Sequence, residues 1–262
     1  MHVNMKTNKV WKYAVIVMGM LTVMSCKHEQ KVLEVFDDET VTEKRALKGF
    51  EEVEVLGSPT VYYTQADTFS VVVKGAKGVV ENIITEVDDH TLKVRNRGKV
   101  GIFNVSIRDV GEAAVFVTSP DIIGIRVSGS GDFISERPVD SDKIEIQLRG
   151  SGDIRLENLI CDDCATSVIG SGDASVRRLE ARRVSASLIG SGNINLGLWK
   201  VDDTQLQVTG SGDIDADFHE GCQKLDCELR GSGDITLNGQ VSHLSKHKTG
   251  SGDIDTGKLV VR

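Results

Sequence analysis

Apolar and polar residues alternate through the C-terminal half of the chain, from about residue 121 to residue 262. Apolar pairs two positions apart recur at Ile125 and Val127, Ile146 and Leu148, and Leu206 and Val208. This alternation predicts β-strands that turn one face to a core and the other to solvent. The spacing typical of an amphipathic helix is absent from the region, so we expect an all-β architecture here.

A Gly-Ser-Gly-Asp motif separates the alternating stretches. It occurs seven times, with spacings of 21, 20, 20, 20, 21 and 19 residues, and Asn193 replaces Asp in the fourth copy. A unit of about 20 residues is too short to bury its apolar face alone, so neighbouring units must stack. The repeat therefore predicts a parallel β-solenoid with one unit per coil, in which seven coils at ~4.8 Å extend over roughly 34 Å.

Each motif is expected to form a corner of the solenoid, because glycine allows unusual backbone angles and Asp accepts hydrogen bonds from nearby backbone N–H groups. The predicted corner residues are Gly129, Asp132, Gly150, Asp153, Gly170, Asp173, Gly190, Asn193, Gly210, Asp213, Gly231, Asp234, Gly250 and Asp253. Stacked carboxylates could instead bind calcium, as in nonapeptide repeats. Only one acid stands at each corner, however, and calcium takes six to eight oxygen ligands. We favour structural turns and expect no metal or cofactor.

Charged residues recur at two positions between the corners. Asp162, Arg182 and Asp202 lie eight residues before the next corner glycine, and Asp163, Arg183 and Asp203 lie seven before it. Stacking would align them in two Asp-Arg-Asp columns, where opposite charges on adjacent strands contribute ~0.2–1 kcal/mol each. The columns favour inter-coil ion pairs over a nucleic-acid patch.

The region before residue 121 also predicts strands, at 53–56, 60–63, 69–73, 92–94, 103–107 and 115–117, and a short helix within 79–87. No Pro/Gly/Ser linker separates this region from the repeats, so we expect one continuous domain over residues 46–262, with repeat coils from about 121. Residues 26–45 are polar and charged and are expected to form a tether.

The first 25 residues have the features of a lipoprotein signal peptide. Lys6, Lys9 and Lys12 precede an apolar run over 13–24, which is too short to span a membrane. The run leads into Val23-Met24-Ser25-Cys26, which resembles a bacterial lipobox. We expect export, cleavage before Cys26, lipidation of Cys26 and anchoring in the bacterial cell envelope, at the outer membrane; an ordinary signal peptide is the alternative.

Net charge narrows the range of partners. The full chain carries -8, and removal of a leader with three lysines leaves -11. That charge argues against nucleic acid and anionic lipid headgroups as partners. The membrane is therefore expected as a partner only through the lipid anchor.

Four further cysteines lie in the repeats. Cys161 shares its repeat position with Ala181, Val201 and Cys222, and Cys227 shares its position with Ile146 and Leu206, so these positions predict core packing. A disulfide between Cys161 and Cys164 remains an alternative. A zinc site formed by His219, Cys222, Cys227, His243 and His247 is not expected, because the spacing matches no zinc module.

Aromatic residues could form a binding face. Trp199 is expected in the core, because it is in phase with Leu159 and Leu179. The candidates for exposed aromatics are Tyr62, Tyr63, Phe116 and Phe218, which do not cluster in sequence.

The runs GFEEVEVLGSPTVYYTQADTFSVVVKG, ITEVDDHTLKVRN and VFVTSPDIIGIRVSGSGDF resemble the head GIN domain family of putative auto-transporter adhesins. The resemblance extends from about Phe50 to Arg262. It implies a right-handed parallel β-helix, an exported lipoprotein of the bacterial envelope and a role in adhesion. It supplies no catalytic residue.

Three functions remain open at this point. The first, which we favour, is a non-catalytic module that binds a surface glycan or a protein ligand. The second is a structural or assembly protein of the cell envelope. The third is a polysaccharide-active enzyme, for which the repeats contain no evident patch of acids and bases that interrupts the pattern.

Overall fold

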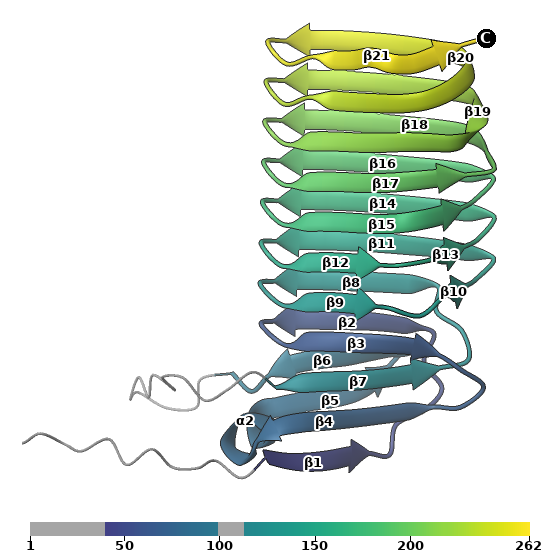
Figure 1. The fold of residues 1–262 in the computed structure, drawn as a ribbon. Coiled ribbons are helices and arrows are strands. Elements are labelled where there is room, and N and C mark those ends of the chain that lie inside the picture. The colour runs from purple at the N-terminus through teal and green to yellow at the C-terminus, as the bar shows by residue number, and fades with distance from the viewer. Residues whose placement is uncertain (1–39, 99–112) are drawn as a thin grey trace, which may run out of the picture. The chain divides into compact units, whose positions relative to one another are not determined.

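The computed structural model describes residues 40–98 and 113–262. Cys26, the signal peptide and the strand expected at 103–107 lie outside these residues. Within them the fold is a parallel β-solenoid of about seven turns, which confirms the predicted class. Each turn of the repeat region lies directly above the previous one, and the strands of successive turns pair in parallel (Figure 1).

One face of the solenoid, the first face, consists of strands that enter the Gly-Ser-Gly corners. Its strands, in stacking order, are β5 (Ile83–Asp88), β6 (Thr91–Asn96), β2 (Glu52–Gly57), β8 (Gly124–Gly129), β11 (Lys143–Gly150), β14 (Asp163–Gly170), β16 (Arg183–Gly190), β18 (Val201–Gly210), and the C-terminal parts of β19 (Asp213–Gly231) and β20 (Ile235–Gly250).

The second face consists of strands that leave the corners. Its strands, in stacking order, are β1 (Thr40–Arg45), β4 (Ser70–Ala76), β7 (Ala114–Ser119), β3 (Thr60–Gln65), β9 (Asp132–Ser135), β12 (Asp153–Leu156), β15 (Asp173–Glu180), β17 (Asn193–Trp199), the N-terminal parts of β19 and β20, and β21 (Ile254–Val261). Short strands β10 (Val139–Asp140) and β13 (Leu159–Ile160) complete two of the coils.

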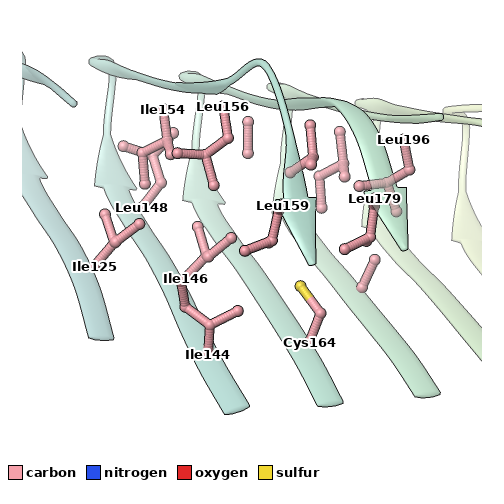
Figure 2. Close-up of a cluster of buried hydrophobic side chains, with 14 of the residues drawn as sticks. Ile125, Ile144, Ile146, Leu148, Ile154, Leu156, Leu159, Cys164, Leu179 and Leu196 are labelled. Carbon is pink, nitrogen blue, oxygen red and sulfur yellow. The ribbon is translucent and has the colours of Figure 1, made fainter. Parts of the chain in front are cut away.

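The core lies between the two faces and is built from the inward residues of the alternating pattern. Ile125, Ile146 and Leu148 from the first face meet Ile154, Leu156 and Leu159 from the opposite side (Figure 2). All six side chains are buried. Because each coil contributes the same positions, the core is a set of columns that continues from coil to coil.

The base of the solenoid contains a coil that the repeat pattern did not predict. Strands β2 and β3 meet at Gly57-Ser58-Pro59, and Gly57 pairs with Gly129 of the first repeat. Gly57 has φ +93° and continues the column of corner glycines. The repeat coils therefore start on a coil at residues 52–65, and not at about 121.

Below this coil the chain folds back on itself. Strands β6 and β7 pair in parallel with β2 and β3, although they come later in the sequence. Strands β1, β4 and β5 then add in antiparallel orientation and cover the open edges (Figure 1). This antiparallel end protects the edges of the parallel coils from pairing with other chains.

Two predictions for this region need correction. The expected tether ends at residue 45, but residues 40–45 form β1, which pairs with β4 and belongs to the folded domain. The helix expected within 79–87 is α2 (Lys77–Asn82), and the β-branched residues that follow form β5 instead. No helix in the described parts of the chain has the length and apolarity to cross a bilayer.

Candidate functional site

Outward-facing apolar side chains, two of them exposed and two half-buried, form a stripe on the second face near the base. It consists of Val72 on β4, Phe116 on β7, Tyr62 on β3 and Ile134 on β9, and we call it the aromatic stripe. Tyr62 and Phe116 are direct neighbours in the parallel register, with ring centroids 5.4 Å apart and ring planes at 20°. They are 36% and 43% exposed, so the stacked pair presents a large apolar surface to solvent.

The inward residues of the same strands pack in the core and hold the aromatic stripe in place. Val61 and Tyr63 on β3, and Val115 and Val117 on β7, point inward and are buried. The Tyr63 hydroxyl forms a 2.9 Å hydrogen bond with Ser119 Oγ, and burial raises the pKa of Tyr63 to about 12. The stripe therefore stands on a rigid strand pair and not on a loop.

Polar groups surround the stripe. Lys44 lies next to Val72 in the register at one end, and Arg155 lies next to Ile134 at the other. The hydroxyl-bearing residues Thr60, Thr64 and Thr118 flank the two aromatic residues on neighbouring outward positions. An apolar centre with hydrogen-bonding groups at its margin can bind a ligand by contact and orientation.

A second feature is a groove of about 1050 Å³ on the first face, which we call the charged groove. It crosses β11, β14, β16 and β18 near the start of each strand and extends to residues of β2, β19 and the segment before β8. The outward side chains in its middle are the small residues Ala165 and Ser185, with Glu145 and Gln205 on the strands to either side. Seven acidic and three basic side chains line it.

The predicted corner residues form the expected columns, but the carboxylates bond across coils. Oδ1 of Asp132, Asp153 and Asp173 each accepts the backbone N–H of the corner residue in the next coil, at 2.9, 3.3 and 2.9 Å. Asp213 and Asp234 do the same at 2.7 Å. Asn193 is the exception, because the N–H of Asp213 donates to Gly192 O instead.

Within the described chain, no group of three or more His, Cys, Asp or Glu side chains has an arrangement that could hold a metal ion.

The two charge columns behave differently. Asp163, Arg183 and Asp203 are in register, and Arg183 Nε lies 2.5 Å from Asp163 Oδ1. The Arg183 guanidinium lowers the pKa of Asp163 by hydrogen bonding. Asp162, Arg182 and Asp202 are linked through backbone hydrogen bonds, but no ion pair within 4.0 Å joins their side chains in the described structure.

The charge column that contains Asp163 extends over more coils than predicted. Lys143 and Lys224 occupy the same register position on β11 and β19, so the charges alternate over five coils. The fixed position seven residues before each corner glycine was the signal that could have identified Lys143 and Lys224.

All four described cysteines are free and buried. Cys161 and Cys222 lie in one core column and Cys227 in another, as predicted. The Cys161 thiol donates a hydrogen bond to Cys164, and this bond together with burial raises the pKa of Cys161. Burial raises the pKa of Cys227 to about 12. Raised pKa values make the thiols of Cys161 and Cys227 poor nucleophiles at neutral pH.

The aromatic candidates divide into two groups. Tyr62 and Phe116, which are 54 positions apart in sequence, come together in the stripe, whereas Tyr63 and Phe218 are buried. Trp199 was expected in the core, but Leu198 occupies that column and Trp199 is half-buried at the surface. Its ring stacks on the His219 ring with centroids 3.8 Å apart, and Arg178 Cζ lies 4.6 Å from the centroid of the Trp199 ring.

Comparisons with known proteins agree with this architecture. The family model described as "Putative auto-transporter adhesin, head GIN domain" matches residues 49–221 and 200–262. No curated protein matches the chain.

Solved structures with the same fold include a "putative adhesin" from Bacteroides fragilis, with 25% identity, a TM-score of 0.72 and coverage of 82% of this chain and 96% of that one. A "putative adhesin" from Parabacteroides distasonis has 20% identity, a TM-score of 0.66 and coverage of 83% and 96%. A "putative lipid binding protein" from the same species has 21% identity, a TM-score of 0.63 and coverage of 84% and 98%.

Proposed function

Because the chain belongs to the head GIN domain family of putative auto-transporter adhesins, we propose that it is a non-catalytic binding module of the bacterial cell envelope that contacts its ligand through the aromatic stripe. The ligand is a surface glycan or a protein. We further propose that the module is attached to the outer membrane through a lipid on Cys26.

The exposed stack of Tyr62 and Phe116 is the observation that supports this proposal. Two adjacent aromatic rings on paired strands leave apolar surface in water, and a ligand that covers them removes this unfavourable exposure. Their inward neighbours already fill the core, so the fold does not require aromatic residues at these two outward positions. Exposed aromatics of this kind are frequent energetic centres of binding surfaces.

The test is a binding screen against glycan arrays and immobilised matrix proteins, using the unmodified protein and the double variant Tyr62→Ser, Phe116→Ser. Loss of two aromatic anchors should weaken the best interaction at least about tenfold. The matched control is Ile160→Ser with Val260→Ser, which removes two other side chains with 38% and 49% exposure. Equal binding by the unmodified protein and the aromatic double variant would refute the role of the stripe.

A further inference from the structure

The charged groove has an excess of carboxylates that the fold does not pair. Each of its three cations already contacts an acid of the groove. Lys143 lies 3.8 Å and Arg183 2.5 Å from Asp163, and Lys224 lies 2.6 Å from Asp226. The groove thus offers no cation that is free to bind an anionic ligand.

Four acids of the groove have no cation within 4.0 Å among the described residues, namely Asp121, Asp142, Glu145 and Asp203. Asp203 lies in register between Arg183 and Lys224, but both of these cations bond to other carboxylates. Asp142, just before β11, and Glu145, on β11, are exposed, and Asp203 on β18 is half-buried. Charge complementarity therefore selects a cationic occupant.

The positions of these acids define a spacing. Strands β11, β14, β16 and β18 are consecutive neighbours, so the acids at β11 and Asp203 are three strand steps apart, about 14 Å at ~4.8 Å per step. The small residues Ala165 and Ser185 lie on the two strands between them. In an extended peptide, residues i and i+4 are on the same side and about 13 Å apart.

We propose that the charged groove binds an extended peptide segment that carries two basic side chains four residues apart. One basic side chain pairs with Asp142 and Glu145, and the other pairs with Asp203. The small side chains of the intervening peptide residues pass over Ala165 and Ser185. This site is on the opposite face from the aromatic stripe, so it stands independently of the function proposed above.

The probe is a fluorescent peptide with the sequence Ser-Thr-Lys-Ser-Thr-Ser-Lys-Thr-Ser, measured by fluorescence anisotropy with the purified full chain. A control peptide of identical composition places the two lysines side by side. The spaced peptide should bind at least about tenfold more tightly than the control, because only its lysines reach both ends of the groove. Equal affinity for the two peptides would overturn the proposal.

A pair of variants separates the groove from general electrostatic attraction. Asp142→Asn with Asp203→Asn removes one acid at each end, whereas Asp215→Asn with Asp217→Asn removes two exposed acids from the second face. The groove variant should bind the spaced peptide at least about tenfold more weakly, and the control variant should bind it unchanged. Equal weakening in both would overturn the proposal.

Two further measurements complete the test. A glucosamine oligomer serves as a non-peptide amine, and its binding to the groove in place of the spaced peptide would also overturn the proposal. Thermal melts of both variants check folding, and Glu145→Gln provides a second groove variant, for which at least about threefold weaker binding is expected. Unchanged binding by Glu145→Gln and by the double variant would contradict the proposed contact.

Discussion

The two glycines of each Gly-Ser-Gly corner meet one shared steric requirement, and the first meets a second one as well. The first, such as Gly170 with φ +132°, adopts a backbone conformation that side chains with a Cβ rarely reach. The second, such as Gly172, has no positive φ of this kind, but a Cβ on it would lie 2.1 Å from the carbonyl oxygen of Gly152 in the coil below. The first glycine also approaches the coil below, since a Cβ on Gly170 would lie 2.3 Å from the carbonyl oxygen of Gly150. The first glycine is thus needed for both its φ and close approach, and the second for close approach alone.

Hydrogen bonds at the corner explain why the coils approach so closely. Gly150 O accepts the N–H of Ser171 at 2.8 Å and that of Gly172 at 3.0 Å. The carboxylate of Asp153 accepts the next backbone N–H, that of Asp173. Three consecutive N–H groups of one corner are therefore satisfied by the corner below, and any side chain between them would break the set.

Gly172→Ala should lower the free energy of unfolding by about 3 kcal/mol, because the new methyl group forces neighbouring corners apart. Ser171→Ala is the matched control, since Ser171 is exposed and lies between the two glycines. Urea denaturation followed by circular dichroism measures both variants. A value for Gly172→Ala within about 0.5 kcal/mol of the control would contradict a steric requirement at this position.

At the scale of elements, the sequence predicts what repeats locally and misses what depends on distant pairing. The coils from residue 121 could be predicted, because each one repeats the same alternation and the same corner. The coil of β2 and β3 was missed, because Pro59 replaces the second corner glycine and only Gly57-Ser58 remains. The pairing of β2 with β6 leaves no local pattern to detect, because β3, β4, α2 and β5 lie between the two strands in the sequence.

The aromatic stripe depends on the same distant pairing. Tyr62 and Phe116 become neighbours only because β7 pairs with β3, and Val72 joins them because β4 pairs with β7. Alternation requires Tyr62 and Tyr63 to point to opposite sides of the strand, but it does not determine which of them is inward, and both were candidates for exposure. The register with the neighbouring strands decides this.

The last coil differs from its neighbours at positions that hold core residues elsewhere. Lys246 pairs with Cys227 and Lys248 with Leu229, in an unshifted register from Leu244 to Gly250. The shorter spacing before Gly250 therefore does not move these lysines out of phase. Both are exposed, and Lys248 Nζ lies 3.2 Å from Asp253 Oδ1. Lysine at the edge of a sheet opposes pairing with another chain.

Replacement of Lys246 and Lys248 by valine should promote association, because it removes the charges from an exposed strand edge and leaves an apolar one. Sedimentation velocity at micromolar concentration measures the effect. The control is Lys143→Val with Lys224→Val, which changes two exposed lysines inside the stack, where both neighbouring strands are already paired. If the unmodified protein already forms end-to-end polymers, the lysines do not protect this edge. A structural role in the cell envelope would then be favoured over a role in adhesion.

At the scale of the molecule, the solenoid separates two surfaces of different chemistry on one rigid scaffold. The aromatic stripe lies on the second face near the antiparallel base, and the charged groove lies on the first face over the middle coils. Outward residues of paired strands form the aromatic stripe and the middle of the charged groove, and the groove's margin also includes Asp121 and Asp142 from the segments before β8 and β11. Rigid placement lowers the entropic cost of binding.

Lipidation of Cys26 is the prediction that concerns the molecule as a whole, because it decides where these surfaces act. The apolar run over 13–24 is too short to span a bilayer, and Ser25-Cys26 follows it at the expected cleavage position. More than one acyl chain makes a stable anchor, since each buried methylene contributes about 0.8 kcal/mol. Thirteen residues separate Cys26 from β1, a length that spans at most about 45 Å when extended.

Metabolic labelling with an alkyne fatty acid should mark the unmodified protein and the Cys161→Ala control, and should be lost in Cys26→Ala. Label that persists in Cys26→Ala would show that the cysteine is incidental and that the leader is an ordinary signal peptide.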